Sequence, residues 1–377
     1  MGTPRARIFF LDKLRAFLIL LVVLYHVGIV YEASGVGAVF WIVDDPATND
    51  LAGLLNLVID IFVMPTLFLV SGYFAPSSLE NKGGRGFLLS RVRRLLVPWA
   101  LAVLLLMPLY KILFLASRGL PQEPWWSYFH FSNGILSQSW LWFLPILFLF
   151  DLLYWLGSRL GLETPRILPR SAVTGALVIG FGYGLVFDLL DLRGWTKTVL
   201  VDFQNERILI YFMAFLLGVL FYRRGVFDHP PKGKAWYHVV NSLAWLPVMG
   251  YLVFLLFPWI NPGKVLVGEV ADRVILWLFF QLSLLCLVYA VIETFRRYGA
   301  KPGGKMTTAL VKSAYGVYIV HVVVLGGLAL LLLELAWPSL LKYLILTFLA
   351  YAVSNLLVTG YRNWLGSGAS RRRLESS

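Results

Sequence analysis

Long apolar stretches alternate with short polar connections along the whole length of this 377-residue chain. A helix needs roughly 20 apolar residues to cross a hydrocarbon layer about 30 Å thick, and ten stretches come close to that length. The pattern therefore predicts an all-α, polytopic membrane protein. The predicted spans lie at about residues 14–32, 51–75, 95–116, 139–157, 171–190, 208–222, 236–257, 272–292, 313–333 and 342–361.

Charged residues fall between the apolar stretches, and their signs differ on the two sides of the predicted membrane. The N-terminus and every second connection are basic, as in 82–94, whereas the first connection carries Asp44, Asp45 and Asp50. Because cytoplasmic connections carry an excess of Lys and Arg, this alternation predicts that both termini are cytoplasmic. The net charge of +13 is then a topology signal, so we expect a lipid bilayer and no nucleic acid as a partner.

Composition and cysteine content limit the class of protein further. Hydrophobic residues make up 59% of the chain and charged residues 14%, whereas a soluble protein has about half and about a quarter. The single Cys286 excludes an intramolecular disulfide, and no metal-binding motif is present, so no metal site is expected. We expect one domain, residues 1–377, with a first span retained as an anchor and a basic, flexible cytoplasmic tail at 366–377.

The first predicted span carries two ionisable residues, Arg15 near its cytoplasmic end and His26 past its middle. An ionisable side chain at the bilayer centre costs at least about 2.5 kcal/mol, so both are functional candidates. Eleven residues turn a helix by about 1100°, or three turns and 20°, which puts both side chains on one face about 16 Å apart. Each residue also has a purely structural interpretation. Arg15 could extend its side chain to the membrane interface, and His26 could only pack helices together.

Depth along the predicted helices brings other polar residues into the layer of His26. At about 1.5 Å per residue, His26 lies about 12 Å and Asp60 about 14 Å below the outer edge of the hydrocarbon, and Gln281 lies at a similar depth. As a hypothesis, Asp60 accepts the Nδ1 proton of His26, directly or through water, and leaves Nε2 as a base. A more cytoplasmic layer contains Asp151 and His321, for which helix packing is favoured over catalysis.

Two further groups of cations are candidates for binding anions. Arg91 and Arg94 are three residues apart in a predicted helix, so they share a face and could hold phosphates, although they also serve as a topology signal. On the outer side, Arg193, Lys197 and Arg207 could hold a succinate carboxylate or could pair with neighbouring acidic residues. The sequence leaves both alternatives open.

Five motifs in order resemble those of the acyltransferase family 3 membrane proteins, which transfer acyl groups to extracytoplasmic carbohydrates and other acceptors. They are the spacing of Arg15 and His26, "IDIFVMPTLFLVSGYF" at 59–74, "FLLSRVRRLLVP" at 87–98, "WLWFLPILFLFDLLY" at 140–154 and "SAYGVYIVH" at 313–321. Within that family, "VDFQNERILIYFMAFLLGVL" at 201–220 is similar to the glucan biosynthesis protein C branch, which is associated with succinylation of periplasmic glucans. The chain departs from that branch at two positions: many relatives have histidine or an aromatic residue in place of Val63, and many have histidine in place of Trp140.

The resemblance implies transfer across a membrane, which in this family is the inner membrane of a bacterium. It also implies acyl-CoA as a co-substrate and no permanently bound cofactor. Arg15, with Arg91 and Arg94, would hold the CoA phosphates, and the pantetheine arm would follow the stripe to His26. His26 would be a general base with Asp60 as its partner, or would form an acyl-histidine. Further residues expected to line the site are Gln281, Tyr315, Tyr318, His321, Asp151 and Trp142.

A proton-coupled transporter of a small polar solute would also keep His, Asp and Arg inside its helices, so the sequence leaves this alternative open. A transporter predicts flux of an intact solute, whereas an enzyme predicts CoA release that depends on an acceptor. The sequence does not separate an acetyl from a succinyl donor, and it gives no oligomeric state.

Overall fold

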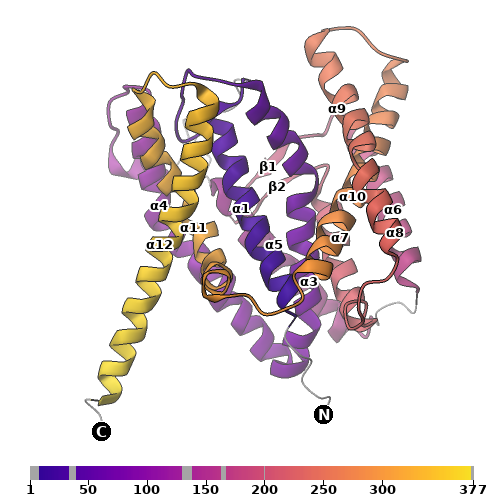
Figure 1. The fold of residues 1–377 in the computed structure, drawn as a ribbon, viewed down its shortest axis with the longest axis horizontal. Coiled ribbons are helices and arrows are strands. Elements are labelled where there is room, and N and C mark those ends of the chain that lie inside the picture. Colours follow the sequence, from indigo (N-terminus) through magenta and orange to yellow (C-terminus); the bar gives the residue numbers. More distant parts are fainter. Residues whose placement is uncertain (1–7, 34–39, 130–137, 163–166, 199, 375–377) are drawn as a thin grey trace. The chain divides into compact units, whose positions relative to one another are not determined.

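The computed structural model describes residues 8–33, 40–129, 138–162, 167–198 and 200–374, with side chains described as far as residue 365. The described part is almost entirely helical, apart from one small two-stranded hairpin (Figure 1). Eight helical stretches in it are long and apolar enough to cross a membrane. The prediction of an all-α, polytopic membrane protein is therefore confirmed, whereas the number of spans and the sidedness of the termini stay predictions.

The chain divides into two compact units, each of which is built from segments far apart in the sequence. Residues 1–59, 104–129 and 301–377 form the first unit, and residues 60–103 and 130–300 form the second. Helix α3 (Asp50–Arg91) begins in the first unit and continues into the second, and α4 (Val97–Ser117) runs from the second unit back into the first. The sequence predicts one domain. The spacing of apolar residues along the chain does not show which distant segments pack together, so it gives no sign of two units.

The first unit is organised around α1 (Phe9–Tyr31), α11 (Lys305–Leu333) and α12 (Ser339–Leu374), which pack against one another (Figure 1). Leu11, Leu14 and Val23 of α1 are completely buried. Large apolar side chains also point outward, since Phe348 and Leu356 of α12 are 71% and 72% exposed. A helix that is apolar on its outer face as well as its inner one is suited to lipid.

The second unit contains most of the remaining elements. They are the π-helix η1 (Val92–Leu96), η3 (Ser139–Trp142), α5 (Phe143–Arg159), α6 (Pro169–Leu189), β1 (Trp195–Lys197), β2 (Asp202–Gln204), α7 (Ile208–Arg223), α8 (Lys234–Leu243), α9 (Trp245–Ile260) and α10 (Glu269–Tyr298). Helix α6 packs against α7 and α10, and α9 packs against α10. The short helix η2 (Trp125–Phe129) belongs to the first unit.

Helices α3 and α7 approach each other at two glycines. A Cβ at Gly72 would overlap the carbonyl oxygen of Phe215, and a Cβ at Gly218 would overlap the carbonyl oxygen of Leu69. Small residues at a crossing of this kind allow two backbones to touch, which is the main way that helices associate in the absence of water. The crossing fixes α7, and with it the residues at the start of α7, against α3.

The hairpin of β1 and β2 is antiparallel and pairs Trp195 with Gln204 and Lys197 with Asp202. The hairpin is not predicted from the sequence, because strands of three residues are too short to show an alternating pattern of apolar and polar residues. Asp202 is buried and accepts a hydrogen bond from the Thr198 backbone, and burial raises the pKa of its carboxyl above the ordinary value. The hairpin brings Trp195 beside the aromatic side chains described below.

One local expectation differs from the structure. The segment from residue 366 onward was predicted to be a flexible tail, but α12 continues through it to Leu374. The glycine-rich stretch between the second and third predicted spans is helical on both sides of a single break at Gly83, whose φ is 66°. A φ in that range favours glycine because it has no Cβ, so the helix axis changes there.

Candidate active site

His26 lies on α1, with its side chain partly exposed, and its Nδ1 atom has two close neighbours. The carbonyl oxygen of Val22, one turn earlier on the same helix, is 2.8 Å away, and Nε2 of His321 is 3.0 Å away. The imidazole rings of the two histidines are 4.9 Å apart between centroids. The first unit therefore joins two histidines that are 295 positions apart in the sequence.

His321 lies on α11 and is fully buried. Its Nδ1 is 2.7 Å from the carbonyl oxygen of Tyr318 and 3.1 Å from that of Val317. A carbonyl oxygen only accepts hydrogen bonds, so Nδ1 of His321 must carry the proton, and Nε2 of the neutral ring is an acceptor.

The same reasoning assigns the proton of His26. Its Nδ1 faces two acceptors, the Val22 carbonyl oxygen and Nε2 of His321, so this nitrogen must be the donor. In the neutral ring, Nε2 of His26 is then left with a free lone pair. Among the described residues of its unit, none hydrogen-bonds to this Nε2, which makes it the atom available as a base or a nucleophile.

Trp41 fixes the plane of the His26 ring. Its indole stacks on the imidazole with the two planes 9° apart and 5.2 Å between centroids, and its Nε1–H donates to the His26 carbonyl oxygen over 3.1 Å. Tyr110 donates to the carbonyl oxygen of Phe40, and Arg118 donates to that of Trp41. Sequence reasoning missed Trp41, because an aromatic residue in a polar connection is common and its stacking partner lies on another element.

A buried ion pair holds the segment that carries Trp41. Nζ of Lys342, on α12, is 3.0 Å from the Asp45 carboxylate, and these side chains are only 2% and 1% exposed. Asp45 also accepts from the backbone N–H of Ala47, and Lys342 donates to the carbonyl oxygen of Leu333. The pair therefore ties the segment after Trp41 to the start of α12 within the first unit.

Other residues predicted for the site lie at different places in the first unit. Arg15 is on α1, eleven residues before His26, with a side chain that is 44% exposed and 3.9 Å from the Asp12 carboxylate. Tyr318 is buried, and its ring centroid is 6.1 Å from that of His321. Tyr315 is 40% exposed, and six residues before His321 it points to a different side of α11, about 240° around the helix.

The prediction that Asp60 accepts a hydrogen bond from Nδ1 of His26 is wrong, because both groups have other partners. Nδ1 of His26 is occupied by Val22 and His321, as described above. In the second unit, the carboxylate of Asp60 forms an ion pair with the guanidinium of Arg207, which precedes α7. Equal depth in the membrane places His26 and Asp60 in one layer, but it does not give the direction of either side chain around its helix axis. The partner of His26 was misassigned for this reason.

Aromatic side chains surround this ion pair in the second unit. Tyr211 stacks on Trp142, with ring centroids 5.9 Å apart, and Trp142 meets the exposed Trp195 edge to face at 5.4 Å. The guanidinium of Arg207 lies over the ring of Phe280, 5.0 Å from its centroid. Of the predicted site residues, Trp142 thus lies in an aromatic cluster that comes from η3, β1 and α7.

The predicted common face of Arg91 and Arg94 is also wrong. Residues 92–96 form a π-helix, whose wider turn changes the direction of a side chain three positions later. Arg91 is turned inward, where its Nε is 3.1 Å from the carboxylate of the buried Asp151, whereas Arg94 is exposed. Arg91, the last residue of α3, and Asp151 thus join the end of α3 to α5 within the second unit.

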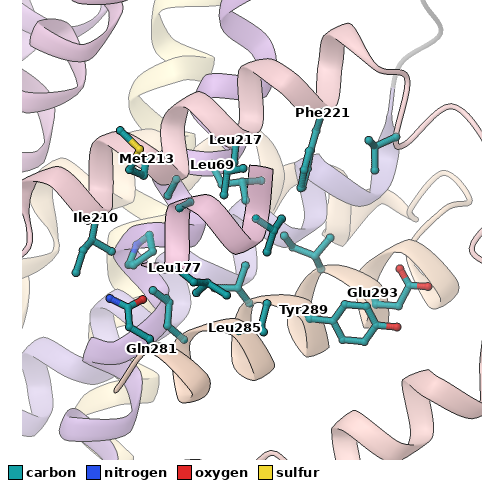
Figure 2. A pocket seen from close by; sticks show the side chains of 18 of the residues that line it. Leu69, Leu177, Ile210, Met213, Leu217, Phe221, Gln281, Leu285, Tyr289 and Glu293 are labelled. Carbon is teal, nitrogen blue, oxygen red and sulfur yellow. The ribbon is translucent and has the colours of Figure 1, made fainter. Parts of the chain in front are cut away.

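The remaining candidates are also placed within the second unit. Gln281 is buried and lines an apolar cavity bounded by α3, α6, α7 and α10 (Figure 2). Arg193, which the sequence predicts to bind either a succinate carboxylate or an acidic neighbour, forms an ion pair with Asp188 at 3.0 Å. Within the described residues, no group of three or more His, Cys, Asp or Glu is arranged to hold a metal ion.

Together these features define a polytopic membrane protein with a neutral histidine whose Nε2 lone pair is held ready for proton transfer or nucleophilic attack. The family model for an acyltransferase domain of the acyltransferase 3 type matches residues 8–359. The chain therefore belongs to this family, which confirms the resemblance seen in the motifs.

Curated relatives are similar to the chain over part of its length. Glucans biosynthesis protein C of Salmonella paratyphi B and that of Salmonella schwarzengrund are each 25% identical to it over 242 residues, which are 61% of this chain. The protein of the same name from Salmonella typhi shows the same identity and coverage. The match spans about 60% of the length of these relatives. No solved structure matches the chain.

Proposed function

We propose that the chain transfers an acetyl or succinyl group from cytoplasmic acyl-CoA to a hydroxyl group of an extracytoplasmic glycan, with His26 as the general base. The observation that carries the proposal is the hydrogen-bonded pair of His26 and His321, which leaves the Nε2 lone pair of His26 free. Because acyl-CoA is made in the cytoplasm, the membrane would be the cytoplasmic membrane of a bacterium.

The reaction requires one proton to move twice. Nε2 of His26 takes the proton of the acceptor hydroxyl, and the oxygen attacks the thioester carbonyl carbon. A carbon–oxygen bond forms, the carbon–sulfur bond breaks, and the CoA thiolate recovers the proton from the imidazolium. During this step Nδ1–H of His26 remains bonded to the neutral Nε2 of His321, which keeps the ring oriented and helps to disperse its positive charge.

Arg15 is proposed to bind a phosphate of the donor. It lies on the same helix face as His26, about 16 Å away along α1, and its side chain is well exposed. A guanidinium suits phosphate because it donates several hydrogen bonds from a planar group. Arg91 is no longer part of this proposal, since it pairs with Asp151, and the role of Arg94 stays a prediction from the sequence.

A carbohydrate acceptor is supported by the aromatic cluster of the second unit. Trp142 and the exposed Trp195 offer flat apolar faces of the kind that pack against sugar rings, and the carboxylate of Asp60, which is 27% exposed, can accept from a hydroxyl group. The name of the curated relatives refers to glucans, which agrees with this class of acceptor. The choice between acetyl and succinyl is left to experiment.

The proposal is tested in proteoliposomes with labelled acetyl-CoA or succinyl-CoA on the Arg15 side and a panel of glycans on the other side. We expect label on a glycan and release of CoA on the donor side. Arg15→Gln should raise the KM for acyl-CoA about tenfold with little change in kcat, and Arg15→Lys should recover part of that loss.

Transport of an intact solute without CoA release would contradict the enzyme mechanism. Accumulation of label on His26 in the absence of acceptor, detected by intact mass, would replace the general base by an acyl-histidine intermediate.

A further inference from the structure

The proposed reaction makes no use of an apolar cavity of about 290 Å³ within the second unit. Its volume is near the lower end, about 300 Å³, of the range for small-molecule sites. Four helices line it, through residues such as Leu69 of α3, Leu177 of α6, Met213 and Leu217 of α7, and Leu285 of α10 (Figure 2). The cavity is therefore a partly open, apolar space that a ligand with a hydrocarbon chain would fill.

The cavity follows one face of α10. Its lining residues on that helix recur every three or four positions, which places them in one row. Figure 2 shows Gln281 at one end of the row and Glu293 at the other, and twelve residues of helix correspond to about 18 Å. A ligand for this space is thus elongated rather than compact.

Gln281 supplies a hydrogen-bond donor without an acceptor. Its side chain is only 4% exposed, and Nε2 has no hydrogen-bond partner among the described residues. Buried polar groups in proteins are almost always paired, so an unpaired amide in the wall of a cavity points to an acceptor on a ligand. The backbone of Gly180 packs beside it, because a Cβ there would lie 2.9 Å from Nε2 and 3.3 Å from Ile210.

At the opposite end of the cavity the charged side chains bind one another and the backbone, although Nε of Arg296 has no hydrogen-bond partner among the described residues. The Glu293 carboxylate is 2.8 Å from a nitrogen of Arg297 and 3.6 Å from one of Arg296. Arg296 also donates to the carbonyl oxygen of Val226. Both guanidiniums are thus held by protein partners, whereas the neutral Gln281 amide has none for its Nε2, so the ligand that fits has a neutral hydrogen-bond acceptor at the Gln281 end and a hydrocarbon chain elsewhere.

We propose that this cavity binds a non-esterified long-chain fatty acid. Its carbonyl oxygen accepts a hydrogen bond from Nε2 of Gln281, and its hydrocarbon chain extends along α10 towards Glu293. The protonated acid is the form that binds, because apolar walls disfavour a carboxylate. A volume of about 290 Å³ suits one hydrocarbon chain rather than the two chains of a phospholipid. This site is independent of the roles proposed for His26 and Arg15.

The test is photo-crosslinking of the full-length protein in phosphatidylethanolamine vesicles with palmitic acid that carries a diazirine near the end of its chain. We expect labels on α7 and α10 near Phe221 and Tyr289, and competition by unlabelled palmitic acid. Gln281→Leu should raise the Kd for palmitic acid about fivefold to tenfold, as expected for the loss of one hydrogen bond. Leu282→Ala, at an exposed neighbouring position on α10, is the matched control and should leave the Kd unchanged.

A second pair of variants tests the cavity itself. Ala176→Trp fills the space from α6 and should abolish labelling, whereas Val178→Trp, at a position that is 65% exposed, should not. Size-exclusion profiles establish that each variant is folded. Equal labelling of Ala176→Trp and Val178→Trp, or an unchanged Kd in folded Gln281→Leu, would overturn the proposal. Competition by phosphatidylglycerol as strong as that by palmitic acid would show that lipid chains in general bind, and would also overturn it.

Discussion

His321 determines which nitrogen of His26 is free. A chain of hydrogen bonds runs from the carbonyl oxygens of Val317 and Tyr318 through His321 to Nδ1 of His26. A serine protease uses a buried aspartate to orient its histidine, whereas here a second, neutral imidazole does so, itself oriented by the backbone of α11. An uncharged partner suits a site inside a membrane, because no isolated charge has to be buried.

We expect His321→Leu to lower kcat by roughly 10²- to 10³-fold, because the His26 ring loses both its orientation and the acceptor for Nδ1–H. His321→Gln should recover part of this loss, since a side-chain oxygen can replace the acceptor. Ring ¹⁵N NMR shifts of the wild-type protein, assigned by comparison with His26→Gln, should identify His26 as the Nδ1–H tautomer. An Nε2–H tautomer would refute the proton assignment.

The sequence predicted Arg15 and His26 because ionisable residues in an apolar run stand out and helical geometry relates their directions. It did not predict that His321 is the partner of His26, since a contact across 295 positions leaves no trace in periodicity. Asp60 was given the wrong partner because depth alone does not determine which way a side chain points. Trp41 was missed because its role depends on the conformation of a connection.

At the scale of elements, the Asp45–Lys342 pair connects the segment that carries Trp41 with α12. Removing one partner of a buried pair leaves an unpaired charge and costs about 3–5 kcal/mol, whereas an exposed pair contributes about 0–1 kcal/mol. We therefore expect Lys342→Met to lower the thermal stability strongly, and Lys342→Met combined with Asp45→Asn to recover much of it.

The Lys111–Glu123 pair, in which Glu123 is 41% exposed, is the matched control, and Lys111→Met should change stability little. Thermal unfolding followed by intrinsic tryptophan fluorescence measures both effects. Equal destabilisation by Lys342→Met and Lys111→Met would show that the buried pair has no special structural importance.

The crossing of α3 and α7 depends on glycine. Gly218→Ala places a methyl group against the backbone of Leu69 and should cost about 1–3 kcal/mol, as overpacking does. Gly182→Ala on α6, with no atom near the added Cβ, should be neutral or should stabilise by about 0.5–1 kcal/mol through higher helix propensity. The same unfolding measurement compares them, and an equal response of the two variants would refute a close backbone contact.

The elements themselves were largely predictable, because apolar length determines a membrane helix. The π-helix at 92–96 was not, since a widened turn has no signature in the pattern of apolar residues, and it reversed the prediction that Arg91 and Arg94 share a face.

At the scale of the whole molecule, the alternation of basic and acidic connections predicts the orientation in the membrane. We expect single cysteines placed at Ser78 or Ser158, in a Cys286→Ser background, to react with an impermeant thiol reagent only from the cytoplasmic side. A cysteine at Thr198, in the hairpin, should react only from the opposite side. Labelling of Ser78→Cys and Thr198→Cys from the same side would contradict the predicted topology.

Catalysis by His26 is the central claim, and it is tested most directly by the rate of glycan-dependent CoA release from proteoliposomes that contain wild-type protein or His26→Gln. The variant keeps a polar side chain of similar size but has no base, so we predict a loss of activity of about 10³-fold or more, with an unchanged size-exclusion profile and thermal stability. A folded His26→Gln protein that releases CoA at the wild-type rate would contradict the catalytic role of His26.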